Sequence, residues 1–381
     1  MVKVNPKNER VKRSFFRYLK NASGCCDSTI NNIENAILLW QEFSQNEDFA
    51  LYNADKAIAF KKWLAKREFR GKPISLVTYH TYLRHLRKFF GWLVRERGYK
   101  SRIKPNAVDY LRITEKEERM ATQFIPRKYP PLEYVKKLVE SIEIKSEIDQ
   151  RDRALISFTL LSGMRDKAIV TLPLGCFDEE SLTIIQNPRK GVETKFAKLI
   201  PTTLFRFDDK MVGFITGWIK YLKTKGFGSQ DPFFPRSKLG QGIDQLAFEA
   251  SSEVEPVFWK GTGSVRDVFK RRSKEAGLPY FPPHTFRHLT TNLAFKSCKN
   301  GEEIKAVSQN LGHEHVATTI SVYGNFDPSR LAEIIKCMDF AGKPQSTMAD
   351  DIKEIKELLT NKPHRDSNSI NETNSKIRKE I

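Results

Sequence analysis

A polar, proline-containing stretch about a third of the way along the chain separates two parts with different sequence patterns. The segment RITEKEERMATQFIPRKYPP, residues 112–131, shows neither helical nor strand periodicity. Proline restricts its own backbone and that of the preceding residue, so such a segment interrupts regular structure. A chain of 381 residues also exceeds the usual length of one domain. The expected parts are a first domain (1–112), a linker (113–130), a second domain (131–340) and a tail (341–381).

The first part has the pattern of a small helical domain. In SLVTYHTYLRHLRKFFGWLVRERGY, residues 75–99, apolar side chains recur at steps of three and four, which places them on one helix face. This stripe comprises Tyr79, Leu83, Leu86, Phe90 and Leu93. Segments from Thr29 and Ala54 have the same character, each after a capping or turn residue. We expect the aromatic side chains to form a core rather than to stack on bases.

The first part is also strongly basic. The chain has a net charge of +19, and residues 61–104 carry fourteen basic side chains against two acidic ones. Such a field favours polyanions and accelerates their encounter, although a solvated, solubility-giving face is the alternative. The phosphate-binding interpretation assigns DNA contacts to Lys61, Lys62, Arg70, Arg84, Arg87, Lys88 and Arg95.

The second part mixes helices with a small sheet. Residues 181–202 show a strand, a turn with proline and glycine, and a second strand. One helix is expected to end near Ser162 and Gly163, and residues 229–260 have too little periodicity for an assignment. Helical patterns cover residues 130–143, 149–172, 206–226, 263–277 and 282–297. The predicted fold class is therefore α+β, mainly helical with a small sheet.

Composition indicates a soluble intracellular protein, and the expected location is the bacterial cytoplasm or nucleoid. No apolar run approaches the roughly 20 residues of a membrane span, and the first residues lack the apolar segment of a secretory signal. Five cysteines without a Cys-x-x-Cys pair argue against a disulfide framework. We expect reduced packing residues at Cys25, Cys26, Cys176, Cys298 and Cys337.

Two histidine-containing segments of the second part suggest a chemical site. In PPHTFRHLTTNLA, His284 and Arg287 share the face of a first helical turn. His288 lies four residues after His284, but Thr285 stands where the hydrolytic zinc motif has glutamate. With His313 and His315 flanked by no third ligand motif, we predict no metal and no cofactor.

Without a metal, these residue types are suited to phosphoryl transfer. Arginine binds non-bridging phosphate oxygens with a planar fork of donors, and histidine moves protons near neutral pH. Tyrosine supplies an oxygen nucleophile, and Tyr323 follows the second histidine segment in GHEHVATTISVYGNF. Arg165, in LLSGMRDKAIVTL, follows an apolar helix and a glycine and adds a second guanidinium.

The order of these segments resembles the tyrosine recombinase family, the phage integrases and Xer-type recombinases. The matching motifs are LLSGMRDKAIVTLPLGCFD, a hairpin with RKG, HTFRH and LGHEHVATTISVY, and the resemblance covers nearly the whole chain. It implies a helical, SAM-like core-binding domain, a linker and a mixed catalytic domain, which together close as a C-shaped clamp on DNA.

The resemblance assigns catalytic roles residue by residue. It implies that Arg165 is the first catalytic arginine, that His284 and Arg287 form the His-x-x-Arg box, that His313 is the histidine of the Leu-Gly-His motif, and that Tyr323 is the nucleophile. The hairpin lysine falls on Lys190, with Lys195 as the alternative. Ala168 departs from the pattern, because many members have glutamate at this position, and this raises the question of how Arg165 is supported.

The implied function is site-specific DNA recombination for the integration or excision of a mobile element. Cleavage would give a 3′-phosphotyrosyl link and a free 5′-hydroxyl, and exchange would pass through a Holliday junction without metal or ATP. The implied partners are double-stranded DNA with inverted-repeat core sites, further copies of the chain in a tetramer on DNA, and accessory DNA-bending proteins. The alternatives are a type IB topoisomerase and a DNA-binding relative that lacks catalysis.

The residues after Tyr323 show two amphipathic patterns. Leu331, Ile334, Ile335 and Met338 form an apolar stripe, which would dock on a neighbouring protomer or pack on its own domain. Residues 348–362 form a second amphipathic helix in the tail, and the residues beyond are expected to be disordered.

Overall fold

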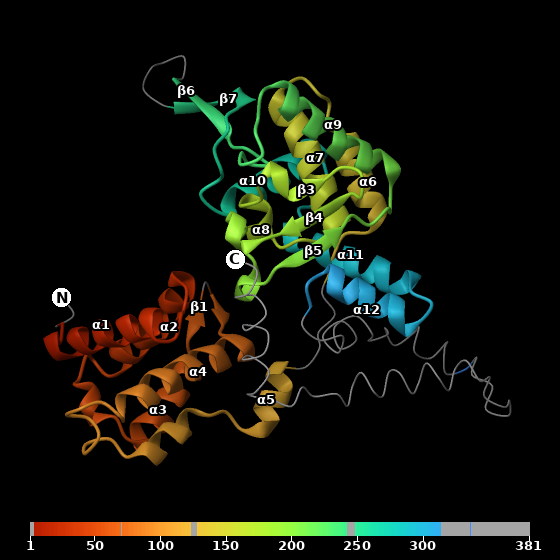
Figure 1. The fold of residues 1–381 in the computed structure, drawn as a ribbon. Helices are drawn as coiled ribbons and strands as arrows, with labels where there is room; N and C mark the ends of the chain where they lie inside the picture. The colour runs from red at the N-terminus through yellow and green to blue at the C-terminus, as the bar shows by residue number, and fades with distance from the viewer. Residues whose placement is uncertain (1–3, 70, 123–127, 242–247, 314–335, 337–381) are drawn as a thin grey trace, which may run out of the picture. The chain divides into compact units, whose positions relative to one another are not determined.

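The computed structural model describes residues 4–69, 71–122, 128–241, 248–313 and 336. The chain forms two compact units, Met1–Ile125 and Pro126–Ile381, shown in Figure 1. Each unit is described by itself. In the described parts of the chain no helix is long and apolar enough to cross a membrane.

The first unit is built from helices around one core. Its helices are α1 (Pro6–Asn21), α2 (Asp27–Phe43), η1 (Phe49–Leu51), α3 (Ala54–Ala65), α4 (Leu76–Leu93), η2 (Pro105–Leu111) and α5 (Glu115–Thr122). A short antiparallel hairpin of β1 (Glu68–Phe69) and β2 (Lys72–Pro73) joins α3 to α4. Asn53 and Ser75 cap α3 and α4 with side-chain oxygens that accept backbone N–H groups, which is why both helices begin there.

Aromatic rings fill the core of the first unit. The apolar stripe predicted for α4 is buried throughout. Trp40 packs against Phe60 and Phe90 with ring centroids 5.1 and 5.0 Å apart, and the buried Tyr52 hydroxyl donates to the carbonyl oxygen of Ala107. Burial of such rings dominates the apolar contribution to a small core. The prediction that these aromatics are core residues is confirmed.

Helix α5 lies within the stretch that was expected to be linker. Its start is a capping box, in which Thr114 Oγ1 accepts from the backbone N–H of Glu117 and the Glu117 carboxylate accepts from the backbone N–H of Thr114. The expectation of no regular structure was wrong here, because a capping box fixes a short polar helix without apolar periodicity.

The second unit combines helices with two small antiparallel sheets. Its helices are α6 (Leu132–Glu140), α7 (Glu147–Ser162), α8 (Asp166–Val170), η3 (Leu174–Cys176), η4 (Pro188–Lys190), η5 (Lys195–Ala197), α9 (Asp209–Thr224), α10 (Gly263–Glu275), α11 (Pro283–Ser297) and α12 (Gly301–Asn310). One sheet has the order β3 (Phe177–Asp178), β4 (Thr183–Gln186), β5 (Ile200–Thr203), with Ile184 opposite Thr202. The other pairs β6 (Ser237–Gln241) with β7 (Phe248–Val254), in the region where the sequence gave no assignment.

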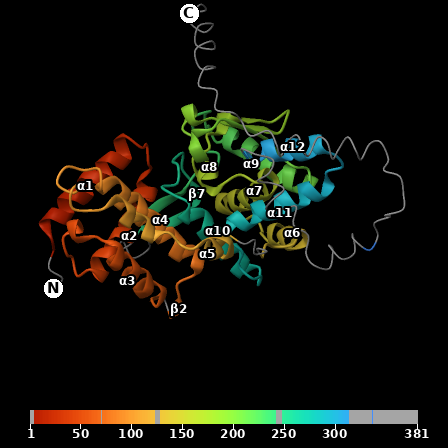
Figure 2. The same ribbon diagram turned by 90° about the horizontal axis from the view of Figure 1, so that it is seen from below.

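Helix α7 is the centre of the second unit. Figures 1 and 2 show it between α9 and α11, with which it makes extensive contacts. Every residue from Ala154 to Ser162 is buried, as expected of a helix that is covered on all sides. Its polar side chains are satisfied locally, since Thr159 and Ser162 donate to carbonyl oxygens four residues earlier. The helix ends where predicted, at Gly163 in the left-handed conformation.

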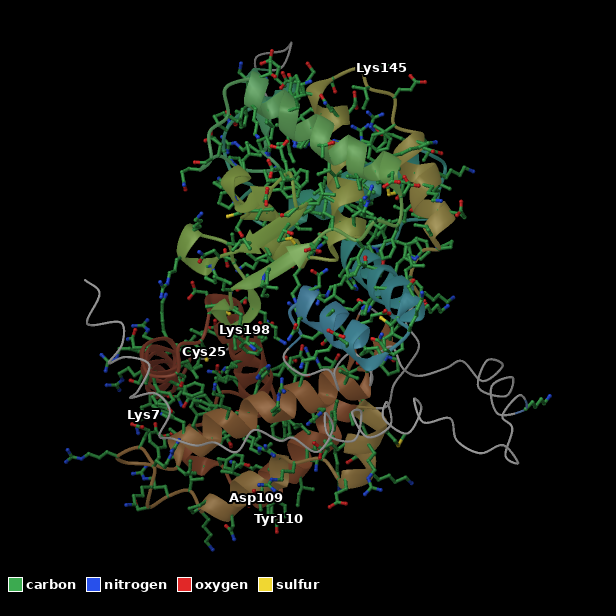
Figure 3. The ribbon with its side chains drawn as sticks, turned by 45° about the vertical axis from the view of Figure 1, so that its right-hand side comes forward. Lys7, Cys25, Asp109, Tyr110, Lys145 and Lys198 are labelled. Carbon is green, nitrogen blue, oxygen red and sulfur yellow. The ribbon has the colours of Figure 1, made fainter. Side chains whose placement is uncertain are left out.

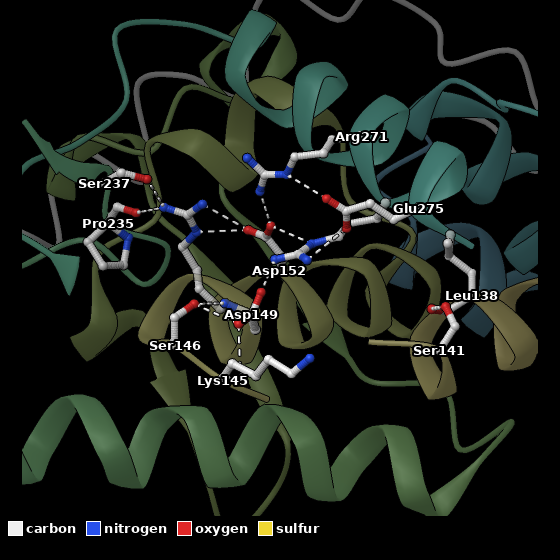
Figure 4. A network of polar contacts seen from close by, with 12 residues as sticks. Leu138, Ser141, Lys145, Ser146, Asp149, Asp152, Pro235, Ser237, Arg271 and Glu275 are labelled. Carbon is white, nitrogen blue, oxygen red and sulfur yellow. Dashed lines mark hydrogen bonds and ion pairs between the residues drawn. The ribbon is translucent and has the colours of Figure 1, made fainter. Parts of the chain in front are cut away.

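A buried charge network joins α7 to α10 (Figure 4). The Asp152 carboxylate is fully buried and accepts from Arg151 Nη2 at 2.8 Å and from Arg272 Nε at 2.9 Å, and it also pairs with Arg271. Arg151 Nη1 in turn donates to the Pro235 carbonyl oxygen at 3.1 Å, just before β6. A buried charge is tolerated only when paired and hydrogen-bonded, so the network fixes α10 and the β6 hairpin against α7. Because α11 follows α10, the same contacts position the helix that carries His284 and Arg287.

Asp152→Asn should destabilise the second unit by about 3–5 kcal/mol, because it leaves the buried guanidinium group of Arg151 without its counter-charge and removes one of the carboxylate partners of Arg272. The matched control is Glu140→Gln, which removes an ion pair with Lys210 whose side chains are 52% and 75% exposed. That change should cost less than about 1 kcal/mol. Amide hydrogen exchange in α7 of the full chain measures both effects. Equal protection in the two variants would contradict the role given to Asp152.

Candidate active site

The guanidinium group of Arg287 joins three segments of the second unit. Its Nη1 donates to the carbonyl oxygen of Gly163 at 2.5 Å, and its Nη2 donates to the carbonyl oxygen of Leu311 at 2.7 Å. The same Nη2 lies 2.9 Å from His313 Nε2. The end of α7, the first turn of α11 and the end of α12 therefore meet at one half-buried arginine.

His313 is held neutral in this cluster. Burial, followed by the positive charges of Arg287 and Arg165, lowers the pKa of His313 to about 4. Arginine carries only donors, so the Nε2 that faces Arg287 accepts the hydrogen bond. A neutral ring that accepts at Nε2 carries its proton on Nδ1. The cluster thus combines two cations with one neutral imidazole donor, an arrangement suited to an anion.

Arg165 enters the cluster from the chain just beyond α7. It is half-buried, stands at the N-cap position of α8 in an extended conformation and acts on the pKa of His313. The Gly163 turn before it permits close packing. A Cβ on Gly163 would lie 2.8 Å from Leu311 Cδ2, and the residue has a φ of +57°. Gly163 therefore lets α7 end directly against the segment that leads to His313.

The end of α12 is fixed to the sheet in a similar way. Thr202 Oγ1 donates to the Asn310 carbonyl oxygen at 2.8 Å, and the Asn310 side-chain oxygen accepts from the backbone N–H of Thr203 at 2.7 Å. A Cβ on Gly312 would lie only 2.6 Å from Ile200 Cδ1. Strand β5 therefore packs directly against the residue before His313.

His284 lies exposed in the first turn of α11, where the sequence pattern placed it. The half-buried carboxyl group of Asp166 has a raised pKa, because burial outweighs the opposing effects of His284 and Arg266. Oδ1 of Asp166 is buried and has no hydrogen-bond partner among the residues that the structure describes. The sequence analysis did not single out Asp166, although it directly follows Arg165.

The position of Asp166 is relevant to residue 168, where many family members have glutamate and this chain has alanine. Ala168 is only 1% exposed, so a glutamate there would have to be buried. Asp166, one residue after Arg165, instead places a carboxylate near His284. The sequence could have indicated Asp166, because this acidic residue directly follows Arg165.

The hairpin lysines lie on the long connection between β4 and β5. Lys190 is exposed at the end of η4, followed by Gly191 in the left-handed conformation. Lys195 begins η5, with its Nζ 4.9 Å from the centroid of the Phe196 ring. The choice of Lys190 over Lys195 remains a prediction.

Most of the predicted DNA-binding residues lie on the surface of the first unit. Lys62, Arg84, Arg87, Lys88 and Arg95 are exposed. Lys61 Nζ donates to the carbonyl oxygen of Arg112 at 2.6 Å, so this ammonium group also has a structural task. The DNA-binding role of this surface remains a prediction.

Several predicted features lie outside the described residues. These are Tyr323, Arg70, His315, Cys337, the apolar stripe at 331–338 except for the single residue 336, and the amphipathic pattern at 348–362. The described cysteines, Cys25, Cys26, Cys176 and Cys298, are free thiols.

Comparison with known proteins gives the family, whose members are DNA strand transferases. The model of the phage integrase family matches residues 132–330, more than half of the chain, and the chain belongs to this family. The tyrosine recombinase XerC of Leptospira interrogans (serogroup Icterohaemorrhagiae serovar copenhageni, strain Fiocruz L1-130) is 24% identical over 333 residues, covering 86% of this chain and 92% of that protein. The ICEBs1 integrase of Bacillus subtilis (strain 168) is 30% identical over 101 residues, 26% of this chain and 27% of its own.

Solved structures share the fold at low sequence identity. The XerH site-specific recombinase in its post-cleavage complex with a palindromic difH substrate has a TM-score of 0.56 at 18% identity, covering 86% of this chain and 84% of that chain. A lambda integrase dimer bound to a COC′ core site has a TM-score of 0.55 at 14% identity, covering 84% and 79%. The predicted family and the α+β fold class are confirmed.

The low pKa of His313 predicts a pH-dependent stability. In the unfolded chain a histidine titrates near its reference pKa of 6.5, whereas in the folded protein His313 titrates near 4. Between these values the unfolded state binds more protons, so stability should fall as the pH is lowered from about 6.5 to about 4. Allowing for the half-buried position, we expect about 1–2 kcal/mol.

The measurement compares urea denaturation of the wild type with that of His313→Gln from pH 7.5 to 4.5. The wild type should lose stability relative to the variant below pH 6.5, and the two curves should run parallel above it. A constant difference over the whole range would contradict the neutral, buried state assigned to His313.

Proposed function

We propose that this protein is a site-specific DNA recombinase that cleaves and rejoins DNA through a 3′-phosphotyrosyl intermediate, for the integration or excision of a mobile element. The observation that carries the proposal is the junction at Arg287, which holds two arginines and a neutral histidine together at the meeting point of α7, α11 and α12. Family membership supports the same assignment.

The cluster is suited to stabilise charge on a scissile phosphate. Arg165 and Arg287 would pair with the non-bridging oxygens, and His313 would donate a hydrogen bond from Nδ1. The packing around Gly163 and Gly312 supports this role, because preorganised donors need no rearrangement as charge develops in the transition state.

Two proton transfers complete the proposed step. Tyr323 attacks the phosphorus, the bond from phosphorus to the 5′-oxygen breaks, and a phosphotyrosyl bond forms. His284 would accept the phenolic proton, assisted by the nearby Asp166 carboxyl group, and Lys190 would give a proton to the departing 5′-oxygen. The 5′-hydroxyl of a partner strand can reverse the step, because the phosphotyrosyl link conserves the phosphoester bond.

Exchange between two duplexes requires more than one protomer. We infer a tetramer on paired, inverted-repeat core sites, with a Holliday junction as the intermediate and accessory DNA-bending proteins as further partners. The basic surface of α4 would bind the DNA backbone. The lambda integrase relative is described as a dimer bound to a core site.

Tyr323→Phe tests the proposal directly. The substitution removes one oxygen and keeps the ring, so folding and DNA affinity should persist while covalent attachment is lost. Wild-type protein on a nicked half-site should give an adduct that survives SDS, because the short fragment with the 5′-hydroxyl diffuses away. The adduct should also form in EDTA, since arginine, histidine and lysine carry all the assigned charges.

An adduct that persists in Tyr323→Phe would place the nucleophile elsewhere. Relaxation of supercoils by the wild type, without recombination between paired sites, would instead favour a topoisomerase.

Arg287→Lys should impair cleavage much more than DNA binding. Lysine keeps the charge but cannot hold two carbonyl oxygens and a histidine in one plane, so the cleavage rate should fall by about 10²–10³. The matched change is Arg84→Ala on the exposed face of α4, which should lower affinity and reduce the slope of log K against log salt by about 0.9. Single-turnover cleavage at saturating DNA measures the cleavage rate separately from the DNA affinity. Equal losses of rate and affinity in Arg287→Lys would make this arginine an ordinary backbone contact.

A further inference from the structure

The connection between β4 and β5 presents an aromatic ring to solvent from a strained backbone. Phe196 is 72% exposed and has a φ of +63°, and Ala197 follows with a φ of +51°. Left-handed conformations are unfavourable for bulky residues, and the surrounding structure has to impose them. A single exposed apolar residue needs no explanation, but an exposed ring held in a left-handed conformation does.

The loop is held in this shape by its own contacts. Thr194 Oγ1 donates to the Lys198 carbonyl oxygen at 2.6 Å, and the backbone N–H of Ala197 donates to the Thr194 carbonyl oxygen at 3.2 Å. On the preceding side, the backbone N–H of Glu193 donates to Thr171 Oγ1 at 2.9 Å, and its carboxylate pairs with Lys167. Phe196 is therefore presented by an ordered loop, so little ordering entropy opposes a contact that it makes.

The same anchors place the loop beside the cluster of Arg165, Arg287 and His313. Lys167 and Thr171 belong to α8 and its end, and α8 starts directly after Arg165. At its other end the loop leads into Ile200, which packs against Gly312 next to His313. Figure 3 shows Lys198 at the opposite end of the second unit from Lys145. Phe196 thus lies on a loop whose two ends are anchored next to the segments that carry Arg165 and His313.

The charge around the ring favours a polyanionic partner. The loop carries Arg189, Lys190, Lys195 and Lys198 but only one acid, Glu193, which is paired with Lys167. Lys195 Nζ lies 4.9 Å from the Phe196 ring centroid. An apolar ring surrounded by cations has the composition of a side chain that enters DNA between base steps while its neighbours bind phosphates.

We propose that Phe196 is a wedge that unstacks a base step beside the cleaved phosphate. This inference rests on the proposed function, since it takes the duplex to lie on the Arg165, Arg287 and His313 cluster. Phenylalanine inserted at a step kinks the duplex and weakens stacking there. Unstacked bases next to the break are freer to leave their own duplex and pair with the partner strand. A contact of Phe196 with a second copy of the chain is the competing arrangement.

The experiment uses the full chain on a single half-site that carries 2-aminopurine at successive positions around the cleaved phosphate. Wild-type binding should raise the fluorescence at one or two steps next to the break. Phe196→Gly should abolish this signal and slow single-site cleavage by about tenfold, because base–aromatic stacking is lost. The Kd should change by less than about threefold, because the phosphate contacts remain. Phe196→Leu, which keeps an apolar wedge, should restore part of both signals.

A thermal unfolding measurement and a control variant distinguish the loss of the wedge from misfolding. Glycine readily adopts a positive φ, so Phe196→Gly should unfold at the same or a higher temperature than the wild type. Ile144→Ala truncates another exposed apolar side chain of the same unit, 43% exposed and next to Lys145, and should leave the fluorescence and cleavage unchanged.

Three results would overturn the proposal. If Phe196→Gly leaves fluorescence and cleavage unchanged while the wild-type adduct depends on Tyr323, the wedge proposal is wrong and the proposed recombinase function stands. Normal single-site cleavage with a loss only of pairing between sites would make Phe196 a contact between copies of the chain. Absence of any wild-type adduct would contradict both the proposed function and the wedge proposal.

Discussion

The second unit depends on the pairing of one buried carboxylate. Asp152 lies fully buried on α7, and a charge in that position requires partners that are themselves fixed. Arg151 and Arg272 meet this need, and through them α10 and the chain before β6 are held against α7. The positions of Arg165 and Arg287 follow from this arrangement. Arg165 comes after the end of α7, and Arg287 comes one helix after α10.

The electrostatic properties of the Arg287 cluster depend on this rigid packing. Two carbonyl oxygens and the His313 ring fix the position of the Arg287 guanidinium group. Burial and the positive charges of Arg287 and Arg165 keep His313 neutral. The concentration of positive charge is unfavourable in the free protein, and an anion relieves it. Under the proposed function, a scissile phosphate would be bound there where charge develops during transfer, and such differential stabilisation would accelerate the reaction.

The region around Ala168 differs from the family pattern, and the structure offers another carboxylate there. The sequence places alanine at 168, and the structure buries it. Asp166, two residues before that position, still interacts electrostatically with His284 and Arg266. A pattern defined by spacing misses this replacement, because spacing encodes position along the chain and not the direction from which a side chain approaches. The loop with Phe196 was missed for the same reason: neither a positive φ at a phenylalanine nor its exposure is written in the local pattern.

The sequence by itself determined the helices with apolar stripes, the end of α7 at Gly163, the hairpin of β4 and β5, and the residue types of the phosphoryl-transfer set. These features are local, since periodicity, caps and glycine act within a few residues. Only the tertiary structure decided which groups meet: Asp152 with Arg272, more than a hundred residues apart, and Arg287 with Gly163, Leu311 and His313. It also decided that His313 is neutral and that Asp166 interacts electrostatically with His284, because burial and the field of distant charges set a pKa, and neither exists until the chain has folded.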